Sequence, residues 1–189
     1  MRLFTLGLVV ALAACAPSTA ETTTSQPGTT TVAQDPFDPD DLTLYESPTY
    51  GFAVAYPEDW TVSEVGAENL IGFTAPSTGA TLTPNFNVTV NEVSPDFPPI
   101  AYYEGEIERV TTALENAEIL EAVNVNVNGV IGRGLTIVTR QSGVDIGISR
   151  MIVINDDRAY ELSFFAEASE LDRLSDMVAA IIQSFRFLE

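Results

Sequence analysis

Apolar residues alternate with small or polar residues in several short stretches after Leu42, and this period of two is typical of β-strands with one buried face. The alternation is clearest in three runs, which are Phe52, Val54 and Tyr56; Phe86, Val88 and Val90; and Val123, Val125 and Val127. We expect each run to form a strand that turns its apolar side chains toward a core.

Tight-turn signals separate the stretches in the second half of the chain. Asn128 and Gly129 both tolerate the positive φ of a type I′ turn, so they predict a hairpin that leads into the run VIGRGLTIVTR. QSGVD at 141–145 and NDDR at 155–158 predict the turns on either side of the run IGISRMIVI. With the following run AYELSFFA, these signals predict an antiparallel meander of four strands.

The stretch YGFAVAYPEDW at 50–60 is rich in aromatic residues and is a candidate for a binding motif. Pro57 cannot donate a hydrogen bond to a sheet, so we expect the strand to end there. Glu58 and Asp59 then form a turn, and Trp60 folds back onto the core. We therefore interpret this stretch as the opening strand of a fold, not as an active site.

Two later stretches carry apolar residues at steps of three and four, the period of an amphipathic helix. Pro98 and Pro99 suit a helix start, and Ser169 with Asp172 predicts a capping box at the second helix. The predicted stripes are Ile100, Tyr103, Ile107, Val110 and Leu114 in the first helix, and Leu171, Leu174, Val178, Ile181 and Phe185 in the second. The sequence therefore predicts an α+β domain over residues 42–189, an antiparallel β-sheet with helices packed on it.

The N-terminal segment reads as an export signal. Residues 1–14 hold one Arg and a short apolar run, and Leu12-Ala13-Ala14-Cys15 resembles the bacterial lipobox, whose Cys becomes the lipidated N-terminus after cleavage. Cys15 is the only cysteine, so no intramolecular disulfide can form. We expect a palmitate-type lipid anchor at Cys15 that holds the exported protein on the cell membrane or outer membrane, facing the periplasm or the extracellular side.

Residues 15–41 have the composition of a disordered linker, because they are rich in Thr, Ser, Pro and Asp and offer few apolar side chains to bury. The segment DPFDPDD at 35–41 has some oxygen ligands of a calcium loop but lacks the turn glycine and the distal glutamate of an EF-hand. We interpret it as solvated linker.

Three motifs resemble the PsbP/Mog1-like superfamily. They are YESPTYGFAVAYPEDWTV at 45–62, VNGVIGRGL at 127–135 and RAYELSFFAEASELDRLSDMVAAIIQSFRF at 158–187. The resemblance implies an α/β/α sandwich, and the superfamily includes the extrinsic PsbP subunit of photosystem II, the nuclear-transport factor Mog1 and many bacterial lipoproteins. Metal ligation attributed to PsbP proteins involves His in part, and this chain has no His, so those positions cannot be carried over.

Composition excludes much chemistry. All eight basic residues are Arg, and the formal net charge of −19 disfavours binding to nucleic acid. The absence of His removes a Ser-His-Asp triad, and the absence of Lys removes a Schiff base and a Walker A lysine. We therefore expect no enzyme activity, no cofactor and no metal site.

Carboxylates are the remaining candidates for chemistry, either for glycoside hydrolysis or for weak binding of a divalent cation. The clusters are Glu58 with Asp59, Glu104 with Glu106 and Glu108, and Asp156 with Asp157. We interpret each as a turn or a solvated helix face. Tyr102, or Phe97 in the proline-rich loop, is a candidate for a contact surface.

The sequence thus predicts a membrane-tethered envelope lipoprotein whose domain binds a protein partner without catalysis. Two alternatives stay open. One is a subunit or assembly factor associated with photosystem II, and the other is a carboxylate enzyme, which would need two buried acids about 5–10 Å apart across a cleft.

Replacing the lipidated residue tests the anchor. Cys15→Ser removes the thiol that accepts the lipid, so we expect loss of membrane retention or a block in removal of residues 1–14. Membrane fractionation and the mass of the N-terminal peptide measure the two effects. Unchanged retention in the variant would contradict the lipid anchor.

Overall fold

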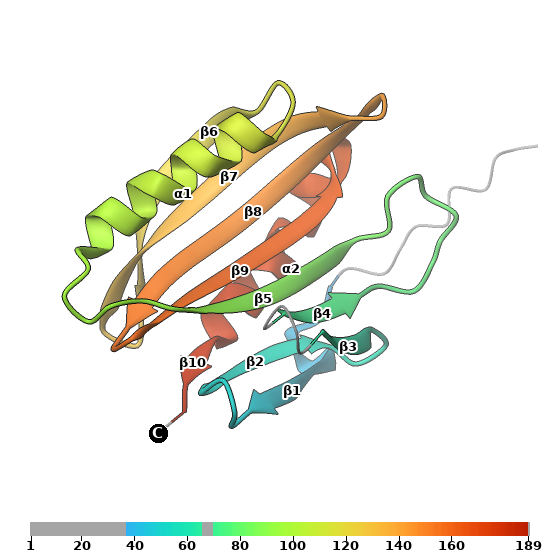
Figure 1. Ribbon diagram of the computed structural model, residues 1–189. Helices are drawn as coiled ribbons and strands as arrows, with labels where there is room; N and C mark the ends of the chain where they lie inside the picture. The colour runs from blue at the N-terminus through green and yellow to red at the C-terminus, as the bar shows by residue number, and fades with distance from the viewer. Residues whose placement is uncertain (1–36, 66–69, 189) are drawn as a thin grey trace, which may run out of the picture. The chain divides into compact units, whose positions relative to one another are not determined.

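In the computed structural model, which describes residues 37–65 and 70–188, a seven-stranded antiparallel sheet lies between two helices (Figure 1). Its strands, in chain order, are β3 (Thr61–Val65), β4 (Leu70–Thr74), β5 (Asn85–Glu92), β6 (Glu118–Val127), β7 (Val130–Gln141), β8 (Val144–Asn155) and β9 (Arg158–Glu167). Across the sheet the order is β3-β4-β5-β9-β8-β7-β6, so the chain crosses from β5 to the far edge before it returns through the meander β6 to β9.

The remaining elements cover the faces of this sheet. They are β1 (Leu42–Ser47), β2 (Phe52–Pro57) and β10 (Arg186–Phe187), the helices α1 (Pro99–Ala113) and α2 (Leu171–Ser184), and the short 3-10 helices η1 (Pro39–Asp41) and η3 (Ala168–Glu170). Helix α1 lies on one face, while α2 and the three-stranded sheet β1-β2-β10 lie on the other (Figure 1). The α+β class and the sandwich of helices around an antiparallel sheet are confirmed.

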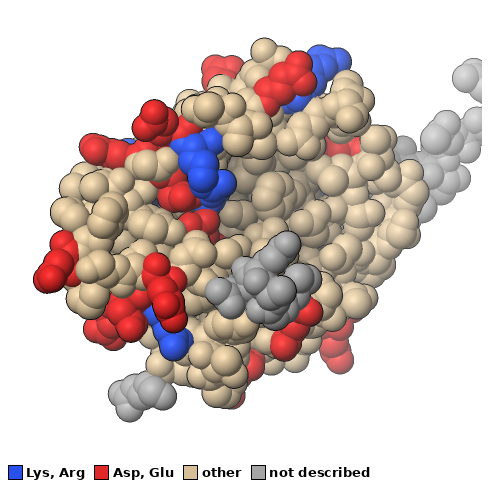
Figure 2. Space-filling model, in the orientation of Figure 1, with Lys and Arg blue, Asp and Glu red and all other residues tan. Residues whose placement is uncertain are grey.

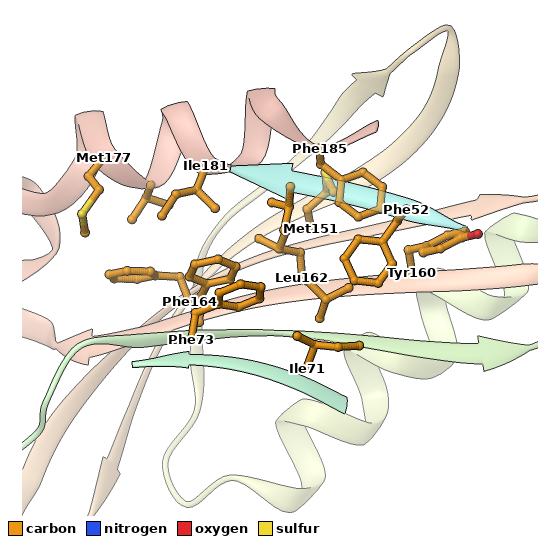
Figure 3. Close-up of a cluster of buried hydrophobic side chains, with 14 of the residues drawn as sticks. Phe52, Ile71, Phe73, Met151, Tyr160, Leu162, Phe164, Met177, Ile181 and Phe185 are labelled. Atoms are coloured by element: carbon orange, nitrogen blue, oxygen red, sulfur yellow. The ribbon is translucent and has the colours of Figure 1, made fainter. Parts of the chain in front are cut away.

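The main core lies between the sheet and α2 with β2. Phe73 of β4 stacks on Phe86 of β5 at a centroid distance of 4.2 Å, and Trp60 packs 5.9 Å from Phe86, as its predicted return to the core requires. Figure 3 shows Met177 and Ile181 of α2 pointing from above toward the side chains of the sheet. Burial of these large apolar surfaces is the main favourable term in folding the domain.

A smaller core lies under α1. Tyr103 and Val110 are buried there against apolar residues of the two neighbouring strands, Leu135 and Ile137 of β7 and Ile148 and Ile152 of β8. The predicted stripe is wrong at its first position, because Ile100 is 63% exposed. Tyr102 and Tyr103, two and three residues later, make hydrogen bonds to the sheet.

The predicted turns are confirmed by the backbone. Asn128 and Gly129 have φ of 49° and 90°, and they join β6 directly to β7. Ser142 and Gly143, with φ of 50° and 86°, make the next hairpin, and Asp156 at φ 55° makes the last one. A positive φ is expensive for most residues, which is why Asn, Asp and Gly hold all of these positions except that of Ser142.

Other parts of the fold differ from the sequence-based expectations. The capping box is wrong, because Ser169 lies within η3 and the N-cap of α2 is Glu170, which makes no side-chain capping hydrogen bond. Phe37 packs against the main core, and Asp41 accepts a backbone hydrogen bond of 3.0 Å from Glu58. Residues just before Leu42 therefore contribute to the fold.

The signal segment 1–14, Cys15 and the linker up to residue 36 lie outside the described residues. Within the ranges 37–65 and 70–188, no helix has the length and apolar character needed to cross a bilayer.

One pair of identical substitutions tests the two helix faces. Ile181 in α2 is 1% exposed, so Ile181→Ala should lower the free energy of unfolding by about 2–5 kcal/mol in urea denaturation. Ile100→Ala is the matched control in α1, and as a surface change it should shift stability by less than about 0.5 kcal/mol. Equal losses in the two variants would contradict the assigned orientations.

Candidate functional site

The face of the sheet that carries α1 has one apolar half and one polar half. Strand register places residues of adjacent strands in rows across this face, and one row runs Ser63, Gly72, Asn87, Ser163, Arg150 and Leu135. Helix α1 packs on the apolar half at β7 and β8. The half formed by β3, β4 and β5 is polar, and its residues Asn85, Asn87 and Thr89 are half-buried.

A buried ion pair lies at the boundary between the two halves. Glu161 of β9 and Arg150 of β8 pair through Glu161 Oε2 and Arg150 Nη2, and their side chains are only 7% and 10% exposed. Two buried charges are costly to desolvate, so each needs the other. Neither residue was singled out from the sequence, although a charged residue inside the apolar runs AYELSFFA and IGISRMIVI was the available signal.

Helix α1 adds two charged side chains to this pair. Arg150 Nη2 also donates to Glu106 Oε2 at 2.9 Å, and Glu106 is paired with Arg109 one turn later. The interpretation of Glu106 as part of a solvated helix face is therefore wrong, because its side chain is 15% exposed and points toward the sheet charge. Glu104 and Glu108 are exposed, as expected.

Tyr102 closes the cluster on its other side. Its hydroxyl donates to Glu161 Oε1 at 2.6 Å, and Asn91 Nδ2 donates to the same carboxylate oxygen at 3.2 Å. Burial and the hydrogen bond to Glu161 raise the pKa of Tyr102 above its ordinary value, so it stays a neutral donor. The candidate contact residue Tyr102 thus belongs to the cluster, while Phe97 packs edge-on to it at 6.5 Å and stays 45% exposed.

We call these six residues the α1 charge cluster; they are Asn91, Tyr102, Glu106, Arg109, Arg150 and Glu161. It holds two guanidinium groups and two carboxylates, so its formal charges balance. Among the described residues, the one buried side-chain nitrogen or oxygen without a hydrogen-bond partner is Arg150 Nε.

Glu106 and Glu161 are close, but they are not arranged as a carboxylate catalyst. Both bind the same nitrogen of Arg150, so a guanidinium occupies the space between them. A glycosidase needs that space for the sugar and its leaving group. The cluster therefore acts as a structural clamp that holds α1 on the sheet.

The other acidic candidates lie apart from the cluster. Glu58 with Asp59 and Asp156 with Asp157 are exposed in turns, as the sequence analysis expected. Within the part of the chain that the structure describes, no three His, Cys, Asp or Glu residues come together in a way that could hold a metal ion. The candidate lipidation residue Cys15 lies outside that part.

Figure 2 shows the face that carries α1. Acidic side chains are spread around its rim, and basic atoms border a hollow near the middle of the view. The tan surface in and beside the hollow carries little charge.

Comparisons with known proteins agree with this architecture. A family model described as "PsbP-like protein" matches residues 4–187. A comparison with curated protein sequences finds no match.

Solved structures show the same fold at low sequence identity. Cyanobacterial PsbP (CyanoP) from Synechocystis has a TM-score of 0.62 at 14% identity, covering 78% of this chain and 92% of its own. LpqN from Mycobacterium tuberculosis, described as involved in cell envelope biogenesis, has a TM-score of 0.61 at 14% identity, covering 78% of this chain and 92% of its own. The Ran-binding protein Mog1p from Saccharomyces cerevisiae has a TM-score of 0.59 at 10% identity, covering 78% of this chain and 96% of its own.

Removing the buried guanidinium tests the α1 charge cluster. Arg150→Met leaves Glu106 and Glu161 with only the more exposed Arg109 as a charge partner, so the free energy of unfolding should fall by about 3–5 kcal/mol. Arg140→Met is the matched control, because Arg140 is 59% exposed and pairs with an exposed Asp145, a contact worth about 0–1 kcal/mol. Urea denaturation of both variants gives the comparison, and similar losses would show that the cluster is not a buried network.

Proposed function

Because the chain belongs to the PsbP-like protein family, we propose that it is a membrane-tethered lipoprotein of the cell envelope whose domain is a non-catalytic binding module for a protein partner. The lipid anchor at Cys15 holds the protein on the membrane. The domain then recruits or positions a second protein close to that surface.

The observation that carries this proposal is the polar half of the sheet face, formed by β3, β4 and β5, which α1 does not cover. We call it the uncovered polar half. Helix α1 covers β7 and β8, while on the polar half beside it Ser63 is exposed and Asn87 is half-buried. Side-chain amides and hydroxyls on rigid strands donate and accept hydrogen bonds without a charge to desolvate. A rigid polar face of this kind suits recognition of another protein.

Two related folds support a binding role. Mog1p is a Ran-binding protein, and LpqN is involved in cell envelope biogenesis. The formal net charge of −19 favours a partner whose contacting surface is basic or neutral.

The residue types present support a role without catalysis. The whole chain has no His and no Lys, and its single Cys is the residue that we assign to the lipid. The two carboxylates of the α1 charge cluster, Glu106 and Glu161, are paired with Arg150. These residue types therefore favour a binding role over a catalytic one.

A role at photosystem II is the second candidate function, and it rests on the family match and on the fold shared with cyanobacterial PsbP. It requires a source organism with thylakoids and co-purification with the photosystem. A source without photosynthesis would eliminate it and leave the envelope role.

Position-specific photocrosslinking in native membranes tests the partner-binding face. A photoreactive amino acid at Asn87 lies on the uncovered polar half, so it should yield one discrete adduct with another protein on illumination. Asp176, exposed on the outward side of α2, is the matched control position and should yield none. Mass spectrometry identifies the adduct.

The comparison of adduct yields at Asn87 and Asp176 shows whether the crosslink is specific to the polar face. Adducts of equal yield at Asn87 and Asp176, or none at Asn87 while the lipid anchor is intact, would contradict the assigned face.

A further inference from the structure

A pocket opens between the last turns of α1 and the sheet, next to the α1 charge cluster. Its volume is about 200 Å³. The lining residues are Arg109, Val110, Ala113, Leu114, Ile137, Ile148, Arg150, Ser163 and Phe165. The pocket accords with the hollow bordered by basic atoms on the face shown in Figure 2.

The pocket has an apolar body and a polar end. Val110 and Leu114 from α1 face Ile137, Ile148 and Phe165 from the sheet, and strand register places these three sheet residues in one row. Arg150 and Ser163 are neighbours in the next row, and Arg109 lies above them on α1. An occupant therefore meets aliphatic and aromatic walls on one side and two cations with a hydroxyl on the other.

Arg150 has donor capacity left at this polar end. Its Nη2 is bound by Glu106 and Glu161, but Nε is buried and has no hydrogen-bond partner in the described part of the chain. A buried donor without an acceptor is unfavourable. An acceptor that enters the pocket beside Ser163 and reaches the Nε edge after a small shift of the guanidinium removes this cost.

We propose that this pocket binds a small amphipathic monocarboxylate, such as a short branched-chain or aromatic acid. Its apolar body fills the space between α1 and the row of Ile137, Ile148 and Phe165. Its carboxylate accepts hydrogen bonds from Arg150, Arg109 and Ser163. The site is separate from the uncovered polar half of the sheet and does not depend on the proposed protein partner.

Charge and size narrow the ligand class. The charged residues that line the pocket are Arg109 and Arg150, with no carboxylate among the lining residues, and this disfavours a cationic ligand. Glu106 and Glu161 already neutralise two positive charges, so a phosphate or dicarboxylate would bring a second negative charge close to them. A volume near 200 Å³ is below the roughly 300–1,000 Å³ typical of pockets for drug-sized molecules, so the ligand is small.

Titration of the purified full-length lipoprotein in detergent tests the site. The probes are phenylacetate and isovalerate, with phenylacetamide and isovaleramide as their uncharged counterparts. Binding of each probe is measured by calorimetry and by ligand-observed NMR. We expect saturable binding of an acid and at least about tenfold weaker binding of its amide, because a charge-assisted hydrogen bond is lost.

Two variants locate the binding. Ala113→Trp fills the mouth of the pocket from an exposed position on α1, and it should abolish binding of the acid. Arg109→Gln, at a side chain 56% exposed, should weaken binding about tenfold, whereas Arg140→Gln removes the same charge from a surface position outside the pocket and should leave it unchanged. Thermal unfolding of each variant checks that it is folded.

The outcomes separate cleanly. Binding that prefers acid to amide and disappears in Ala113→Trp supports the proposal. Absence of saturable binding by both acids, equal affinity for acid and amide, or binding that survives Ala113→Trp would overturn it. Since no partner protein is present in these titrations, failure here and failure of the crosslinking experiment are independent results.

Discussion

The buried ion pair between Arg150 and Glu161 organises the face of the sheet on which α1 packs. Two buried charges need a partner of opposite sign at close range, and these two pair with each other across the adjacent strands β8 and β9. Glu106 extends the pair to α1, so the helix position is tied to the sheet by charge as well as by apolar packing. The position of α1 and the polar end of the pocket both depend on where this pair lies.

Opposite faces of the same sheet are therefore stabilised in different ways. The α2 side is a continuous aromatic core in which Phe73, Phe86 and Trp60 pack ring against ring. The α1 side has a small apolar core that stops at the α1 charge cluster. An apolar core gives stability, whereas the polar side chains of the α1 face, some of them exposed, are the basis of the proposed binding role.

Local patterns were sufficient to predict the meander, because a two-residue turn such as Asn128-Gly129 specifies its hairpin without help from distant residues. They were not sufficient for β10, which is two residues long and exists only because Phe187 meets Phe52 across the chain. The burial of Glu106 could not be read from helix periodicity either. Its position depends on Arg150, which is 44 residues away in the sequence.

The measurement that tests this account most directly is the hydrogen exchange of the arginine Nε–H groups, followed by NMR with the Arg150→Met variant to assign the signal. The account predicts that Arg150 Nε–H exchanges far more slowly than that of exposed Arg140, because it is buried beside two carboxylates. Exchange of Arg150 as fast as that of Arg140 would contradict it, since the guanidinium would then be in water and neither the clamp on α1 nor the polar end of the pocket would exist.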